Sequence, residues 1–81
     1  NLMLVKVSFE KGSVGAMHSH FHTQTSYIDS GKFEVTIDNE IQLLEQGDAF
    51  FVPSHIRHGL ICLEAGAVID CFNPSREDFL K

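Results

Sequence analysis

The chain has 81 residues and a net charge of −5, with 43% hydrophobic and 21% charged residues. This length predicts a single domain over residues 1–81, because domains typically contain about 100–200 residues. The acidic balance argues against nucleic acid and anionic membranes as partners, since both attract basic surfaces. No apolar run approaches the ~20 residues of a bilayer-spanning helix and no signal-peptide pattern opens the chain, so we expect a cytoplasmic protein.

Short β-type segments separated by turn signals follow one another along the chain. The expected strands cover residues 2–9, 25–28, 33–37, 41–44, 49–52, 60–63 and 67–72. We expect turns at residues 11–12, 29–31, 38–39, 45–48 and 64–66, and a loop between Gly12 and Gly15. Strands spaced this closely predict an all-β protein, either a barrel or a sandwich.

The two ends of the chain carry separate expectations. Asn1 leads directly into a strand, so we expect that part of an N-terminal strand region is missing from this sequence. Near the other end, Pro74 should end the last strand and Ser75 should cap a short helical turn. Cys62 and Cys71 have apolar neighbours, which favours two small buried side chains over a disulfide framework.

Histidines gather in the stretch His18-Ser19-His20-Phe21-His22-Thr23-Gln24. In an extended strand alternate residues face the same side, so His18, His20 and Gln24 should point together, with His22 in phase unless the backbone bends. Imidazole nitrogens and amide oxygens both bind divalent first-row metals. A surface histidine cluster or a tag remnant is the alternative interpretation.

The spacing around this stretch resembles the first motif of the cupin superfamily, G-x5-H-x-H-x3,4-E-x6-G. Gly12, His18, His20, Gln24 and Gly31 occupy its fixed positions, with Gln24 in place of the usual Glu. The resemblance implies the cupin double-stranded β-helix, a jelly-roll barrel that can hold a site in its mouth.

A second stretch resembles the other cupin motif, G-x5-P-x-G-x2-H-x3-N. Gly47, Pro53 and His58 match it, whereas His55 replaces its Gly and Cys62 replaces its Asn. Residues 32–46 separate the two motifs. Because cupins support many reactions, this double match indicates the fold and a metal site but not a particular reaction.

The resemblance implies a divalent transition metal held by four side chains, His18, His20, Gln24 and His58. A neutral Gln24 leaves the ion with more net positive charge, which makes it a better Lewis acid and a more weakly bound one. Nickel, zinc, manganese and iron(II) all suit these ligands. His22 is a hydrogen-bond donor to one of the ligands, a residue facing solvent on a bend, or itself a ligand. His55 is either an exposed turn residue or a substrate contact.

The segment from Asp70 to Phe79 carries a narrower resemblance, to small cupins of pectin and alginate catabolism. These convert 4,5-unsaturated monouronates to their linear keto form, and the resemblance implies catalytic roles for Asp70, Phe72 and Arg76. Asp70 would move protons, Arg76 would bind the uronate carboxylate, and Phe72 would pack on the sugar. A salt bridge from Asp70 to Arg76 or Arg57, or a surface position for Arg76, is the structural alternative.

Other functions fit the same residues. The chain could be a non-catalytic sugar-binding or sensing cupin, a mononuclear iron or manganese dioxygenase, or a domain with a purely structural metal. Each would use a small molecule or a metal, with no nucleic acid and no membrane as partner. By analogy with small cupins that pair through edge strands, we expect a homodimer.

Overall fold

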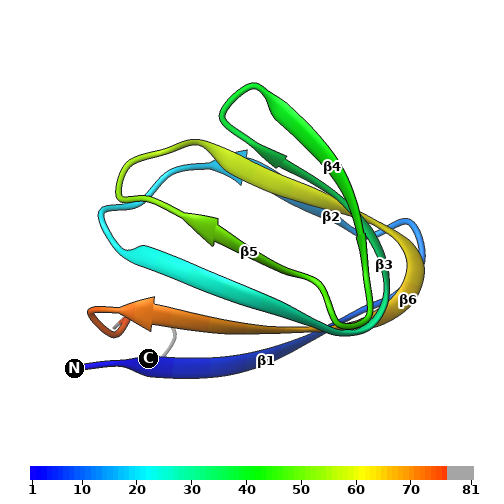
Figure 1. The fold of residues 1–81 in the computed structure, drawn as a ribbon, viewed down its shortest axis with the longest axis horizontal. Helices are drawn as coiled ribbons and strands as arrows, with labels where there is room; N and C mark the ends of the chain where they lie inside the picture. The colour runs from blue at the N-terminus through cyan, green and yellow to red at the C-terminus, as the bar shows by residue number, and fades with distance from the viewer. Residues whose placement is uncertain (77–81) are drawn as a thin grey trace.

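The computed structural model describes residues 1–76, which form six β-strands in one antiparallel sheet system (Figure 1). The strands are β1 (Met3–Phe9), β2 (Val14–His18), β3 (Thr23–Ile37), β4 (Glu40–Glu45), β5 (Ala49–Val52) and β6 (His58–Asn73). Within these residues no helix is long and apolar enough to span a bilayer. The predicted all-β class is confirmed.

Two long strands, β3 and β6, pair along most of their length and bend together, which folds the sheet into two facing layers (Figure 1). In one layer β1 pairs with residues 66–72 of β6, and β5 pairs with residues 24–27 of β3. In the other layer β2 pairs with the start of β6, and β4 pairs with residues 32–37 of β3. This is the arrangement of a jelly-roll barrel.

Two of the predicted turns were wrong, because they lie at the bend that β3 and β6 share. Residues 29–31 and 64–66 do not end strands but lie inside β3 and β6, where the pairing register shifts between Ile28 and Phe33. Gly31 has φ of +85°, and a Cβ atom on Gly66 would overlap the carbonyl oxygen of Ser30. The two backbones therefore cross at a distance that only glycine permits, which is how a bulged strand turns a barrel corner.

Two other expectations near the histidines were wrong. Residues 14 and 15 begin β2 and do not belong to a loop, because they pair with Ile61 and Leu60 of β6. Residues 18–24 do not form one strand either, since β2 ends at His18 and β3 begins at Thr23. The turns at Gly12, Asp38 and Gly47 are confirmed, each with a positive φ.

Apolar side chains fill the part of the barrel near the bend, and polar side chains line the inner face toward the open end. Buried apolar residues form one cluster, which comprises Ile28, Phe33, Val35, Phe50, Val52, Cys62 and Val68. Farther along the same inner faces are Gln24 and Ser26 of β3, both buried, and Asp70 of β6. Cys71 is only partly buried. The predicted helical turn after Ser75 extends beyond the described residues.

Candidate metal centre

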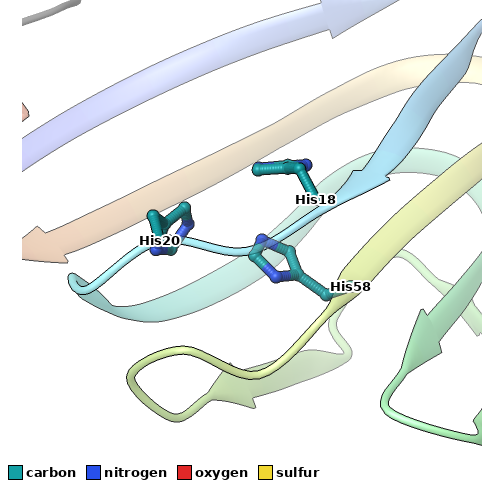
Figure 2. A group of neighbouring side chains, drawn as sticks. All are labelled: His18, His20 and His58. Atoms are coloured by element: carbon teal, nitrogen blue, oxygen red, sulfur yellow. The ribbon is translucent and has the colours of Figure 1, made fainter.

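Three histidines from two separate segments meet at the open end of the barrel (Figure 2). His18 ends β2 and stands opposite His58, the first residue of β6, while His20 lies in the loop after β2. One ligand atom from each of the three side chains lies within 4.8 Å of the others. The cluster therefore arises from a chain bend and a cross-strand pair, and not from alternation along one strand.

Each of these rings is oriented by a backbone carbonyl two residues away. The Nδ1 atom of His18 donates to the Ala16 oxygen over 2.8 Å, and that of His58 donates to the Ile56 oxygen over 2.9 Å. His20 Nδ1 donates in the same way to the His22 oxygen over 2.9 Å. Because Nδ1 carries the proton, Nε2 of each neutral ring presents a lone pair, as a metal ligand requires.

Gln24 adds an oxygen to this set. Its Oε1 lies 3.1 Å from His20 Nε2, and its amide nitrogen donates to Ser26 Oγ at 2.9 Å and to Asp70 Oδ1 at 3.3 Å. The amide oxygen is thus turned toward the histidines. Two lone pairs facing one another are stabilised by a cation, either a proton on Nε2 or a metal ion that both atoms bind.

The side chains present fit a divalent transition metal. Donor atoms bound at about 2.0–2.2 Å to one ion lie about 3–4 Å apart, and the ligand atoms of the three histidines all lie within 4.8 Å of one another. Within residues 1–76, Nε2 of the buried His58 has no hydrogen-bond partner. Burial lowers the pKa of His58 below 6.5, and the nearby charges of His18, His20 and Arg76 lower it further against the effect of the Ile56 carbonyl. The neutral form of the His58 imidazole, which is the form that binds a metal, is therefore favoured.

The residues predicted to act on a substrate lie beside this cluster. Asp70 pairs in register with Ser26, and Phe72 pairs with Gln24, so adjacent strands place all four on one inner face. A cavity of about 190 Å³ opens there. Its polar and aromatic lining includes His18, Gln24, His58, Asp70, Phe72 and Arg76. A larger groove of about 490 Å³ near β4 and β5 contains none of the predicted site residues.

Asp70 is a polar group held on the wall of a largely apolar cavity. Burial raises the pKa of its carboxyl above 3.8, while hydrogen bonds from Ser26 and Gln24 and the charge of Arg76 offset part of that rise. The Arg76 guanidinium carbon lies 5.1 Å from the centroid of the Phe72 ring, a cation–π distance. Arg76 therefore lies beside the cavity and not on a remote surface.

The two remaining histidines differ in position. The His22 ring is buried against Phe21 and Phe72, with centroids 4.0 and 6.3 Å away, and its carbonyl oxygen orients His20. His55 is exposed, has φ of +67° where the motif has Gly, and its backbone N–H donates to the His20 oxygen over 2.8 Å. Their side chains lie outside the three-histidine cluster.

Ser26 is the site residue that sequence patterns did not single out. It is fully buried, and its hydroxyl lies 2.5 Å from Asp70 Oδ1. The available signal was its position two residues after Gln24 on one strand, which places both side chains on the inner face.

This fold, with a histidine cluster at the barrel mouth, defines a cupin. The profile of the cupin domain family matches residues 5–70, and the chain belongs to that family. Among individual proteins, it is 45% identical over 82 residues to the pectin degradation protein KdgF of Dickeya dadantii, and the match covers 99% of this chain and 74% of that protein.

Two solved structures agree with this assignment. KdgF from Halomonas sp. is 45% identical with a TM-score of 0.93, over 96% of this chain and 74% of that one. An RmlC-like cupin from Shewanella frigidimarina is 50% identical with a TM-score of 0.95, over 96% of this chain and 70% of that one. The resemblance to small cupins of pectin catabolism is confirmed by the KdgF matches.

Proposed function

We propose that the protein is a metal-dependent enzyme that converts 4,5-unsaturated monouronates, products of pectin or alginate breakdown, to their linear keto form. The observation that carries this proposal is the convergence of three oriented imidazoles and one amide oxygen beside a carboxylate in one cavity. Support for the substrate class comes from relatives named KdgF, one of which is described as a pectin degradation protein.

His18, His20, Gln24 and His58 would hold the metal, a divalent ion such as nickel, zinc, manganese or iron. When bound there, the ion supplies Lewis-acid polarisation of sugar oxygens. The neutral amide of Gln24 leaves more of the ion's charge uncompensated than a carboxylate would.

The reaction is an isomerisation that gains and loses no atoms. The anomeric hydroxyl gives up its proton and becomes a carbonyl as the bond from the anomeric carbon to the ring oxygen breaks. The ring oxygen takes up a proton and leaves as an enol, and the ketone forms when the enol carbon gains a proton and the enol oxygen loses one. Asp70 accepts and returns these protons, because burial keeps the pKa of its carboxyl above its ordinary value and closer to neutral pH.

Arg76 and Phe72 would hold the substrate for that transfer. The Arg76 guanidinium suits bidentate binding of the uronate carboxylate, and its contact with the Phe72 ring restrains it at the cavity wall. The ring of Phe72 lines the same cavity and would pack against the sugar. This division of roles leaves Asp70 as the residue that moves protons.

The test follows loss of the unsaturated uronate's ultraviolet absorbance, with the bound metal identified by elemental analysis. We expect loss that disappears on chelation and in Asp70→Asn, but persists in Asp29→Asn, the same change at an ion-paired residue of the bend. A protein that binds the uronate, without changing its absorbance, would be a sugar-binding cupin instead. Substrate-dependent oxygen uptake would indicate a dioxygenase.

We also propose that the protein acts as a cytoplasmic homodimer. Among the described strands β1 pairs with β6 alone, so one edge of β1 is open, and Leu4 on this strand is largely exposed. Open strand edges favour pairing with a second copy. Sedimentation at two concentrations tests this, and a monomer at both would contradict it.

A further inference from the structure

Ser26 lies between a proposed metal ligand and the proposed catalytic carboxylate. Its side chain is 0% exposed, so its hydroxyl must find partners within the protein. The Oγ atom donates to Asp70 Oδ1 over 2.5 Å and accepts from Gln24 Nε2 over 2.9 Å. The Gln24 amide nitrogen also donates to Asp70 Oδ1 over 3.3 Å, which closes a triangle of three hydrogen bonds.

The direction of each bond in this triangle follows from proton counting. The hydroxyl of Ser26 has one hydrogen, and a carboxylate can only accept, so that hydrogen goes to Asp70. The lone pairs of Oγ are then left for a donor, and the NH2 of Gln24 supplies it. Rotating the amide of Gln24 by half a turn would set its oxygen against two acceptor oxygens. Ser26 thereby selects the orientation in which Oε1 of Gln24 faces His20.

We propose that Ser26 is a positioning residue that acts on both neighbours at once. It fixes the Gln24 oxygen toward the metal, and it holds Oδ1 of Asp70, whose side chain lines the cavity. The second part rests on the proposed uronate reaction, whereas the first part requires only that the histidine cluster binds a metal. Cross-strand register supports this, because Ser26 is the residue directly opposite Asp70 in the pairing of β3 with β6.

The experiment titrates the metal-free protein and its variants with Co²⁺, read by visible absorption. We expect Ser26→Ala to weaken Co²⁺ binding about 10-fold and to change the ligand-field bands, as loss of a residue that orients a ligand does. The matched control is Ser30→Ala, on the same strand, which loses a hydrogen bond from Ala67 N–H at the bend. This control should leave Co²⁺ affinity within about twofold, the range of independent sites.

A second comparison separates positioning from general loosening. If Ser26 acts on the metal through Gln24, then Ser26→Ala should change Co²⁺ affinity by less than about twofold when it is added to Gln24→Ala. An undiminished effect in that background would overturn the proposal, as would an equal loss in Ser30→Ala or unchanged affinity in Ser26→Ala alone. Should Ser26→Ala not fold, Ser26→Thr retains the hydroxyl and should retain the affinity.

The proposed effect of Ser26 on Asp70 is tested separately, by enzyme kinetics. With the unsaturated uronate as substrate, Ser26→Ala should lower kcat more than it changes KM, since misdirecting Asp70 affects proton transfer rather than substrate binding. If the unaltered protein binds Co²⁺ but does not act on the uronate, the proposed reaction fails while the Co²⁺ titrations still decide the role of Ser26 toward Gln24. A KM effect with unchanged kcat would overturn the proposed effect on Asp70.

Discussion

Gln24 and Asp70 share a hydrogen bond across two paired strands, with Nε2 of the amide 3.3 Å from Oδ1 of the carboxylate. This contact gives a physical reason for the amide where the cupin motif usually has a carboxylate. An amide can present oxygen to the histidines and N–H to Asp70 at the same time. A glutamate at position 24 would have only acceptors to offer, and it would set a second negative charge against Asp70.

We therefore predict that Gln24→Glu destabilises the metal-free protein by about 1.5–3 kcal/mol, the range for lost hydrogen bonds to charged groups. Adding Asp70→Asn should restore most of this loss, because the new amide at position 70 can donate to the new carboxylate. Urea unfolding of the two single variants and the double variant measures the coupling free energy. Strictly additive effects would show that the two side chains do not interact.

Metal binding should stabilise the folded protein, because the ligands converge only in the native structure. With free metal at about 100 times the Kd, the expected gain in unfolding free energy is about 2.7 kcal/mol. His58→Ala should abolish most of that gain. His55→Asn is the matched control, since this exposed histidine lies outside the cluster and Asn tolerates its positive φ. Equal metal-induced shifts in both variants would place the metal elsewhere.

Much of the fold could be predicted from local patterns. Alternation marked residues 33–37, and the turns at Gly12, Asp38 and Gly47 were identified because each needs a positive φ that the local residue type indicates. The bends at residues 29–31 and 64–66 were wrongly predicted as turns that end strands, because that prediction also rested on local patterns. Residues 29–31 resemble an ordinary turn, and only the distant pairing of β3 with β6 shows that the strand continues through them.

The candidate site was also predicted only in part. The two motifs predicted which side chains gather, and His18, His20 and His58 do lie together. The sequence did not predict how they gather, because the facing of His18 and His58 depends on cross-strand register. Ser26 was missed because a lone serine in a strand has no distinctive spacing. Its role becomes visible only opposite Asp70.

The bend supplies a prediction about stability. Gly66→Ala should cost more than about 3 kcal/mol or prevent folding, because the added Cβ would overlap a backbone oxygen of Ser30 that cannot move without breaking the strand pairing. Gly47→Ala is the control, since Gly47 has φ of +94° but open space around it, so only about 1–2 kcal/mol of backbone strain is expected. Urea unfolding of both variants makes the comparison. Similar losses would mean that the close approach at the bend is not limiting.

The pH dependence of the metal-free protein follows from two groups with opposite shifts. Burial lowers the pKa of His58 below 6.5, so between its folded pKa and 6.5 the unfolded chain binds more protons than the native one. Stability from this group is present above pH 6.5 and is lost as the pH falls through the folded pKa. Burial raises the pKa of Asp70 above 3.8, which acts in the other direction, with stability falling as pH rises from 3.8.

We predict that acidifying the chelated protein from about pH 7.5 to about pH 5.5 destabilises it more than it destabilises His58→Gln, which cannot titrate in this range. Subtracting the two curves cancels the other carboxylates and histidines, which both proteins share. Asp70→Asn should remove the opposing contribution and leave the His58 step intact. Unfolding free energies measured at each pH provide the test. Parallel curves for the unaltered protein and His58→Gln would mean that the pKa of His58 is not lowered by folding.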